Sequence, residues 1–264
     1  MEELLVIKIG GNIIDNESAL NQFLQDFANI KAHKILVHGG GKIATDLSNQ
    51  LGIETKMVEG RRVTDEQTIR VVTMTYAGWI NKSITALLQS KKCNVIGLSG
   101  ADAKLFPAIK RPVVEWDYGL VGDLLGEHVN TQFLNQLLVS GIVPVIAPIT
   151  CDDNGHLLNV NADTVARTLA EALSKMYRTT LIYCFEKNGL LRDVNDGLSV
   201  IHEIDRISAE RLKESGVINK GMIPKIDNAL GAIGNGVNSV IIGHATHILK
   251  MAQKEKGYGT YVRA

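Results

Sequence analysis

Short apolar runs alternate along the chain with longer amphipathic stretches, a pattern typical of strands buried in a sheet and helices packed on it. The runs that predict strands are residues 4–9, 34–38, 95–98, 142–148, 180–184 and 239–242. Apolar positions at helical spacing predict helices over residues 43–51, 65–89, 131–140, 208–215 and 222–235, and two more that follow the candidate N-caps Asn16 and Asn161. Because strand, helix and strand follow in succession, the sequence predicts βαβ units and a parallel sheet.

The polar residues between these elements add finer expectations. Thr64 and Gln67 have the spacing of a capping box at the start of the helix over residues 65–89. Short extended pieces are expected at 54–59, 104–110 and 113–116.

Three glycines, Gly39-Gly40-Gly41, separate the run 34–38 from a helical pattern. Glycines beyond a strand let backbone N–H groups approach a ligand, and a helix amino terminus favours an anion. A tight turn has the same composition, and Gly39, Gly41 and Ala44 also satisfy the G-x-G-x-x-A dinucleotide fingerprint. Taken alone, the stretch indicates an anion cradle or a turn and does not decide between them.

Two lysines occupy positions that disfavour a cation. Lys8 lies near the end of the first apolar run, before Gly10-Gly11, and Lys225 lies in the first turn of a helix, where it opposes the dipole by about 0.3–1 kcal/mol. Burying an unpaired ammonium is costly, so each lysine either snorkels to solvent or meets an anion.

Other charged residues at helix starts have two interpretations as well. Arg61 and Arg62 precede a helix, so they are either solvated or available for a carboxylate, which a guanidinium binds bidentately. Asp163 lies in the first turn after Asn161, where its charge complements the helix dipole. On local grounds alone, this dipole effect explains Asp163.

Composition narrows the class of partner. Lys plus Arg and Asp plus Glu number 28 each, so no net charge attracts nucleic acid or anionic lipid, and we expect small-molecule partners. Cys93, Cys151 and Cys184 lie far apart without metal-ligand spacing, which indicates reduced core thiols. With no basic leader and no apolar run near the ~20 residues of a membrane span, we expect a soluble cytoplasmic protein.

The combined inventory is two lysines, two glycine turns, two arginines and one aspartate, without a Ser-His-Asp set or a metal cluster. This inventory favours electrostatic catalysis over acid–base chemistry. Phosphoryl transfer to a carboxylate fits, because a carboxylate with a pKa near ~4 is already ionised at pH 7 and needs no general base. Lysines and backbone N–H groups would bring the two anions together.

Six motifs carry a resemblance to a known family. They are Lys8-Ile9-Gly10-Gly11, His38-Gly39-Gly40-Gly41, Gly60-Arg61-Arg62-Val63-Thr64-Asp65, Gly97-Leu98-Ser99-Gly100, Asn159-Val160-Asn161-Ala162-Asp163 and Gly221-Met222-Ile223-Pro224-Lys225. In this order the chain resembles the N-acetylglutamate kinases of the amino acid kinase superfamily. The resemblance implies an α/β fold, a three-layer α/β/α sandwich around a mainly parallel open sheet with two lobes. Residues 1–175 would bind acylglutamate and dimerise, and residues 176–264 would bind ATP.

The resemblance also implies a role for each matching residue. Lys8 and Lys225 would stabilise the transition state, and Asp163 would hold both lysines in position. The substrate-binding residues would be Gly40, Gly41, Arg62, Asn159 and the neighbouring Arg61, and the nucleotide-binding residues would be Gly10, Gly11, Glu186, Gly189, Gly221 and Met222. ATP would bring Mg²⁺ on its phosphates, with no metal-binding residue in the protein. A homodimer would make N-acetylglutamyl 5-phosphate for arginine biosynthesis.

Departures from the family pattern raise further expectations. The family often has an apolar residue in place of Arg61, so N-succinylglutamate, with its larger acidic acyl group, is an alternative substrate. The usual Ser/Thr-Asp loop is replaced by residues 184–189, and Lys42 replaces a proline. Arginine-inhibited hexamers have an additional amino-terminal helix, whereas this sequence starts at its first strand, so we expect an arginine-insensitive dimer.

Three other functions compete with this interpretation. An aspartate, aminoadipate-type or carbamate kinase would share the fold. A nicotinamide-dependent dehydrogenase would use Gly39, Gly41 and Ala44 but would leave Lys8 and Lys225 without a task. A regulatory nucleotide-binding protein would not need the full set of catalytic positions.

Overall fold

The computed structural model describes residues 1–193, 195–218 and 222–263 of the chain. Its centre is an eight-stranded sheet with the order β14-β16-β15-β11-β1-β2-β8-β5. These strands are β14 (Glu203–Ile204), β16 (Thr260–Val262), β15 (Ser239–His244), β11 (Arg178–Phe185), β1 (Glu3–Ile9), β2 (His33–His38), β8 (Val143–Ile146) and β5 (Val95–Leu98). Strands β15 and β16 pair antiparallel and the other pairs are parallel, which confirms the mainly parallel sheet.

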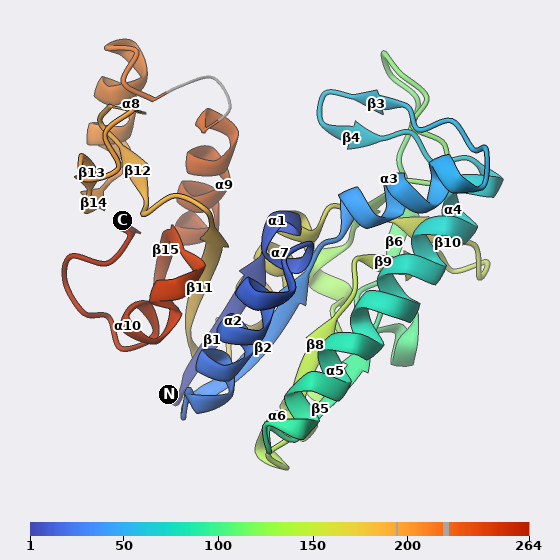
Figure 1. Ribbon diagram of the computed structural model, residues 1–264, viewed down its shortest axis with the longest axis horizontal. Coiled ribbons are helices and arrows are strands. Elements are labelled where there is room, and N and C mark those ends of the chain that lie inside the picture. Colours follow the sequence, from blue (N-terminus) through green and yellow to red (C-terminus); the bar gives the residue numbers. More distant parts are fainter. Residues whose placement is uncertain (194, 219–221, 264) are drawn as a thin grey trace.

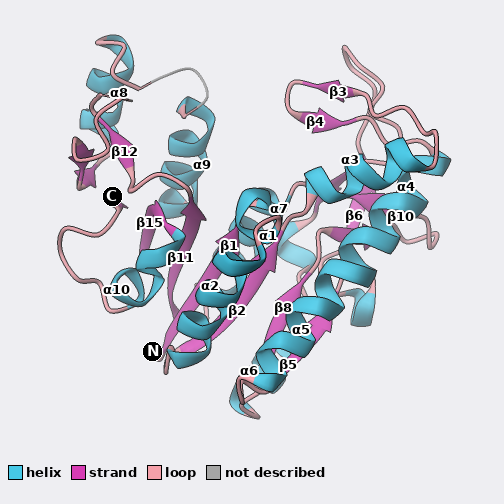
Figure 2. Ribbon diagram, in the orientation of Figure 1, coloured by secondary structure: helices cyan, strands magenta, loops and turns pink. Residues whose placement is uncertain are grey.

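The strands feed two hydrophobic cores, one on each face of the sheet. In β1, Leu4 and Val6 point into one core, and Leu5, Ile7 and Ile9 into the other. The first core is covered by α6 (Thr131–Val139), α7 (Ala162–Leu173), α8 (Arg206–Glu214) and α9 (Ile223–Gly234); the second is covered by α1 (Gly11–Ile14), α2 (Glu17–Asn29), α3 (Gly41–Gln50), α4 (Glu66–Val72), α5 (Asn81–Ser90) and α10 (Ile248–Ala252). Helices therefore lie on both sides of the strands, which confirms the predicted α/β/α sandwich (Figures 1 and 2).

Two predicted helix starts are confirmed by side-chain caps. Asn16 accepts a hydrogen bond from the Ala19 amide, and Asn161 accepts bonds from the Asp163 and Thr164 amides. These caps satisfy amide groups that have no partner inside the helix.

The predicted capping box at Thr64 and Gln67 is wrong. Asp65 is the N-cap of α4 and accepts bonds from the amides of Gln67 and Thr68. The Thr64 hydroxyl instead donates to the Arg62 carbonyl oxygen, because the chain is still extended at this point. The helix then runs on through a π-helical segment η1 (Thr73–Ile80) into α5, and the π-helical turn was not foreseen.

The extended pieces are shorter than predicted. Strand β3 (Met57–Val58) forms a hairpin with β4 (Arg61–Arg62), turning at Glu59 and Gly60, which both have positive φ. Strand β6 (Ala108–Lys110) pairs with β7 (Gly122–Leu124), whereas residues 113–116 form no strand. Residues 113–116 are solvent-exposed and find no partner strand among the described residues.

Smaller elements complete the chain. They are β9 (Ile149–Cys151) paired with β10 (Leu157–Asn159), β12 (Leu190–Leu191) paired with β13 (Val200–Ile201), and three short 3₁₀ turns, η2 (Asp102–Lys104), η3 (Gly126–His128) and η4 (Ala245–His247). No described helix combines the length and the apolar composition that crossing a bilayer requires. The sheet continues without a break from β1 to β11, so the two predicted lobes share one sheet (Figure 1).

Candidate active site

Three loops meet at one edge of the central sheet. In the parallel register, Ile9 of β1 lies beside His38 of β2 and Cys184 of β11. The loops that follow these strands contain Gly10-Gly11, the glycine turn 39–41 and residues 186–189. This is the carboxyl edge, where open α/β sheets bind their ligands.

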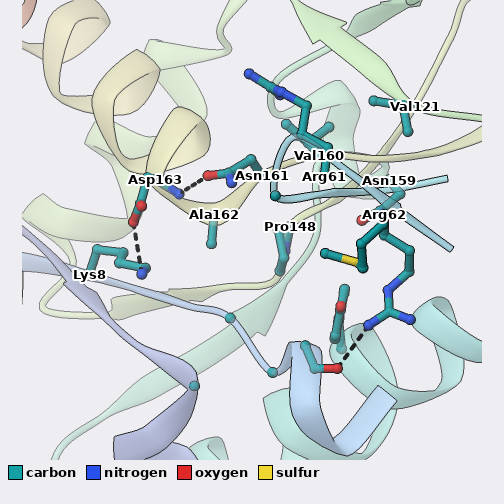
Figure 3. Close-up of a pocket in the computed structure, with 17 residues that line it drawn as sticks. Lys8, Arg61, Arg62, Val121, Pro148, Asn159, Val160, Asn161, Ala162 and Asp163 are labelled. Carbon is teal, nitrogen blue, oxygen red and sulfur yellow. Dashed lines mark hydrogen bonds and ion pairs between the residues drawn. The ribbon is translucent and has the colours of Figure 1, made fainter. Parts of the chain in front are cut away.

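Lys8 points from this edge toward the start of α7. It shares the face of β1 with Leu4 and Val6, on which α7 packs, and only 7% of its surface is exposed. Its Nζ atom lies 2.8 Å from Oδ1 of Asp163, in the first turn of α7 (Figure 3). Asp163 therefore neutralises a buried ammonium as well as complementing the helix dipole.

Lys225 approaches the same aspartate from the other side. It lies in the first turn of α9, and its Nζ atom is 3.8 Å from the ring centroid of Phe185, the last residue of β11. Burial lowers the pKa of Lys225, and the nearby Lys8 lowers it further, while Asp163 and Glu186 raise it. Lys8, Asp163 and Lys225 thus form one charged group.

Gly40 closes the glycine turn in a conformation that other residues rarely adopt. Its φ is 147°, and a Cβ atom there would collide with Cδ1 of Ile80 on η1. Gly41 begins α3, so the amino terminus of this helix faces the same space as Lys8. The turn is therefore both sterically specific and positioned to receive an anion.

A buried histidine holds the base of the glycine turn. His38 is fully buried, and its Nδ1 lies 2.9 Å from the Gly39 carbonyl oxygen while its Nε2 lies 3.1 Å from Nδ2 of Asn81. Asn81 also donates to the Val145 carbonyl oxygen. Burial lowers the pKa of His38 to about 4, so the ring is neutral at pH 7 and its Nδ1–H donates to Gly39.

Arg62 is held against the glycine turn by neutral groups. Its Nη2 donates to the Gly41 carbonyl oxygen at 2.9 Å (Figure 3) and to Oγ1 of Thr45 at 2.8 Å, and its Nη1 donates to Oγ1 of Thr55. It is 7% exposed, and no carboxylate among the described residues pairs with it. An unpaired, preorganised guanidinium at a cavity is suited to a ligand carboxylate.

Asn159 and Arg61 complete this region. Asn159 is held by a bond from its Nδ2 to Oγ1 of Thr64. The Arg61 side chain extends away from the Arg62 guanidinium in Figure 3, and burial, together with the nearby Arg111, lowers its pKa. The two adjacent arginines therefore occupy different environments.

Three neighbouring cavities connect these groups. Cavity A, of about 240 Å³, is lined by Gly40, Gly41, Arg61, Arg62, Asn159, Lys8 and Asp163. Cavity B, of about 340 Å³, is lined by Gly10, Gly11, Glu186, Lys8, Asp163 and Lys225; cavity C, of about 640 Å³, is lined by Gly189, Met222 and Lys225 among others. Lys8 and Asp163 are shared by A and B, and Lys225 by B and C.

Two residues considered in the sequence analysis are not found at these cavities: Gly221 lies outside the described residues, and Lys42 lines none of the three cavities.

A chain with this arrangement matches one family over most of its length. Residues 3–244 match the family model described as the amino acid kinase family. The chain belongs to the amino acid kinase family. It is 54% identical to the acetylglutamate kinase of Cytophaga hutchinsonii over 98% of both chains, and 53% identical to that of Parabacteroides distasonis over 99% of this chain and all of the relative. Membership in this family argues against the dehydrogenase interpretation of Gly39, Gly41 and Ala44.

Solved structures agree with the amino acid kinase fold. The N-acetylglutamate synthase of Neisseria gonorrhoeae superposes with a TM-score of 0.83 at 20% sequence identity, covering 99% of this chain and 59% of that one. At this identity the likeness supports the shared fold and nothing further.

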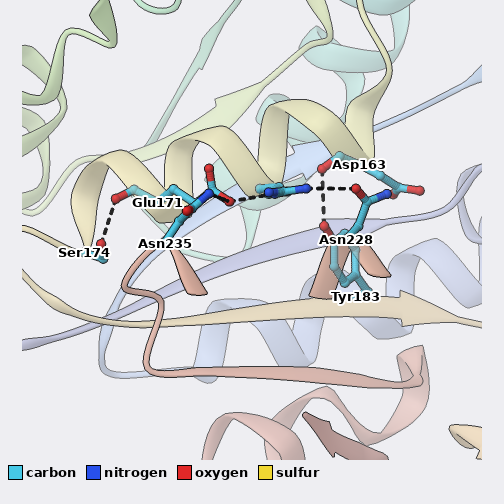
Figure 4. Close-up of polar contacts among 7 residues, drawn as sticks. Asp163, Glu171, Ser174, Tyr183, Asn228 and Asn235 are labelled. Atoms are coloured by element: carbon cyan, nitrogen blue, oxygen red, sulfur yellow. Dashed lines mark hydrogen bonds and ion pairs between the residues drawn. The ribbon is translucent and has the colours of Figure 1, made fainter. Parts of the chain in front are cut away.

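In this kinase-family site, a network of hydrogen bonds, called here the polar clasp and formed by Arg167, Glu171, Asn228 and Asn235, joins the helices that carry Asp163 and Lys225. Arg167 of α7 donates to Oε1 of Glu171 at 2.6 Å and to Oδ1 of Asn228 on α9 at 3.0 Å, and Asn235 also donates to Glu171 (Figure 4). The clasp fixes α7 against α9. It thereby fixes the distance between the carboxylate and the second lysine.

Sequence reasoning missed three residues of the site. Tyr76, within the helix expected over residues 65–89, lines cavity A beside Gly40, and Phe185, within residues 184–189, lies close to both lysines. His38 was read only as part of a motif. For Phe185 a signal existed, because residues 181, 183 and 185 alternate toward the same face of the sheet as Lys8.

The three cysteines are assigned no part in the proposed phosphoryl transfer. Cys93, Cys151 and Cys184 are free thiols, and burial raises the pKa of each. Among the described residues, no group of three or more His, Cys, Asp or Glu side chains is arranged to hold a metal ion.

Proposed function

We propose that this chain transfers the γ-phosphoryl group of ATP to the side-chain carboxylate of N-acetylglutamate, giving N-acetylglutamyl 5-phosphate for arginine biosynthesis. The observation that carries the proposal is the Lys8–Asp163 ion pair shared by cavities A and B. A phosphoryl group that passes between the two cavities must pass this pair. The identity of more than half of the residues with proteins named acetylglutamate kinase supports the choice of substrate.

Cavity A would hold the acylglutamate. Arg62 offers the guanidinium N–H groups that it does not use within the protein to a carboxylate of the substrate, and Asn159 offers an amide. Gly40 and Gly41 present backbone N–H groups to the reacting end of the substrate. The groups around cavity A therefore match a small dicarboxylate.

Lys8 and Lys225 would neutralise the negative charge that gathers when two anions react, and Asp163 would hold their side chains in place. No general base is needed, because the accepting carboxylate is already ionised at pH 7. Catalysis would thus rest on positioning and electrostatics.

Cavities B and C would hold the nucleotide. Gly10 and Gly11 line the path of the phosphates beside Lys8 and Lys225, and Gly189 and Met222 line the larger cavity. Mg²⁺ carried on the nucleotide phosphates would shield their charge.

The N-succinylglutamate alternative gains no support, because the two relatives described above are named acetylglutamate kinase. Arg61 lines cavity A, although its side chain extends away from the Arg62 guanidinium (Figure 3). The homodimer, its insensitivity to arginine, the binding roles of residues 1–175 and 176–264 and the cytoplasmic location stay predictions. Light scattering tests the first of them.

The direct test is ADP release on mixing ATP with N-acetylglutamate. We expect turnover by the wild type and a loss of about 10²–10³-fold in kcat for Lys8→Met and for Lys225→Met, because each removes a charge that stabilises the transition state. Lys31→Met, at an exposed lysine before β2 and so at the opposite end of that strand from the glycine turn, is the control and should keep full activity. Wild-type protein that binds NAD(H) and releases no ADP would refute the kinase function.

A further inference from the structure

Phe185 lies between the two lysines of the site. Its ring centroid is 3.8 Å from Nζ of Lys225 and 5.3 Å from Nζ of Lys8. Both distances are within the range of an attractive contact between a cation and an aromatic face. Among the described residues, this ring is the close partner of the Lys225 ammonium, for which no ion pair or hydrogen bond is seen.

The charges around Phe185 explain why such a contact is needed. Asp163 pairs directly with the Lys8 ammonium, whereas Asp163 and Glu186 act on the Lys225 ammonium from beyond ion-pair distance, and the amino terminus of α9 adds positive potential beside it. Among the described residues, no direct ion pair therefore opposes the repulsion of Lys225 by Lys8. A second carboxylate would hold it but would also neutralise the charge that a phosphoryl group requires. An aromatic face holds an ammonium and leaves its charge in place.

The ring is itself held in a defined position. Phe185 stacks on Tyr183, with centroids 6.1 Å apart and an angle of 18° between the rings. The Tyr183 hydroxyl donates to the backbone carbonyl oxygen of Asp163. Asp163 therefore pairs with Lys8 through its side chain and, through its backbone, holds Tyr183, on which the Phe185 ring beside Lys225 is stacked.

We propose that Phe185 is a positioning residue for phosphoryl transfer, which holds the Lys225 ammonium, and more weakly that of Lys8, in the reactive arrangement without neutralising either. The proposal rests on the kinase function above. It assigns a role to a position at which the chain departs from the usual Ser/Thr-Asp loop of the family it resembles. The side chain acts through the lysines and need not touch either substrate.

The test compares an aliphatic with an aromatic replacement. Phe185→Leu should lower kcat about tenfold and leave the KM for N-acetylglutamate within about twofold, because only the hold on the lysines is lost. Phe185→Tyr keeps the aromatic face and should stay within about twofold of the wild-type kcat. A kcat for Phe185→Leu equal to that of the wild type, or an equal loss in Phe185→Tyr, would overturn the proposal.

Two further measurements separate positioning from packing. Phe133→Leu is the matched control, since Phe133 is also partly buried against the same core; it should lose stability as Phe185→Leu does and keep its kcat. In a Lys225→Met background, Phe185→Leu should cause little further loss of kcat, whereas a full tenfold loss there would show that the ring does not act through Lys225. Absence of ADP release by the wild type would instead refute the kinase function itself.

Discussion

The two sides of the Lys8–Asp163 pair are built in different ways. Around cavity A, several polar side chains are fixed by neutral partners in the protein: Arg62 makes three hydrogen bonds, and His38 and Asn159 are each fixed by a partner. Around cavity B, Asp163 pairs with Lys8, and Lys225 contacts an aromatic ring. One side is organised before a ligand arrives, whereas the other keeps a positive charge that an anion would compensate.

This difference agrees with the two tasks proposed for the site, which are binding a stable dicarboxylate and stabilising a phosphoryl group during its transfer. A site that receives a stable dicarboxylate benefits from rigid donors, because less conformational entropy is lost on binding. A site that stabilises a transferring phosphoryl group needs positive charge that is not already neutralised by the protein, because only interactions that strengthen in the transition state raise kcat. The contrast can be tested on each side separately.

The strongest test of the rigid side is Gly40→Ala. The new methyl group would meet Ile80, and the φ of 147° would be strained in any residue with a side chain, so the turn must move. Since a displacement of about 1 Å near the reacting atoms can cost about 100-fold in rate, we expect kcat to fall about 100-fold. ADP affinity, measured by calorimetry, should change less than about threefold if the nucleotide binds in cavities B and C, as proposed.

Gly39→Ala is the matched control for this change. No atom lies within 4 Å of the position that its Cβ would occupy, and its backbone does not have a positive φ. It should keep its kcat within about threefold. Adding Ile80→Ala to Gly40→Ala removes the collision but not the backbone strain, so a partial recovery is expected. Equal losses in kcat and ADP affinity for Gly40→Ala would assign the turn to the whole site rather than to cavity A.

Much of this architecture could be predicted from the sequence because it depends on local periodicity. The alternation of Leu4, Val6 and Lys8 places the lysine on the face of β1 that α7 covers, and Asn161 begins that helix beside Asp163. These positions allow Lys8 to meet Asp163, but the contact itself was implied by the resemblance to the kinase family, because the helix dipole alone explains Asp163 on local grounds. The structure confirmed the contact at 2.8 Å.

The features that were missed depend on tertiary packing. Thr64 and Asp65 are both good N-caps, but Thr64 is held in an extended conformation by backbone bonds to Tyr118 and Leu120, far along the sequence, so Asp65 caps the helix. The π-helical turn that brings Tyr76 and Ile80 beneath Gly40 has no signature in the apolar spacing. The role of Phe185 needed the position of α9, which no local pattern supplies.

His38 provides a test that does not depend on turnover. Its pKa is about 4 in the folded protein and about 6.5 when unfolded, so between these values the unfolded chain binds more protons. Stability should therefore be complete above pH ~6.5 and decrease as the pH falls toward ~4, by about 2 kcal/mol between pH 7 and pH 5. Urea unfolding at several pH values measures this slope.

Two histidine variants identify the source of the slope. His38→Asn keeps a donor near the Gly39 carbonyl oxygen but cannot titrate, so most of the decrease below pH ~6.5 should disappear. His128→Asn, at an exposed histidine, is the control and should retain the wild-type slope. A wild-type slope in His38→Asn would mean that the buried ring does not govern acid stability.

The smallest expected effect concerns the support of Arg62. The Thr45 hydroxyl accepts from Nη2 of Arg62 at 2.8 Å and donates to the Gly41 carbonyl oxygen at 3.0 Å. Thr45→Val removes one of the three bonds that fix the guanidinium, and a neutral hydrogen bond contributes about 0.5–1.5 kcal/mol. We expect the KM for N-acetylglutamate to rise about threefold, with the KM for ATP unchanged.

Thr85→Val is the matched control for this change, because the Thr85 hydroxyl makes the same bond to a carbonyl oxygen four residues earlier in its helix, away from cavity A. It should leave both KM values unchanged. If Thr45→Val raises the KM for ATP instead, Arg62 serves the nucleotide, and the division between a preorganised acceptor side and a charged transfer side would be wrong. A rise confined to N-acetylglutamate would place that division at the Lys8–Asp163 pair.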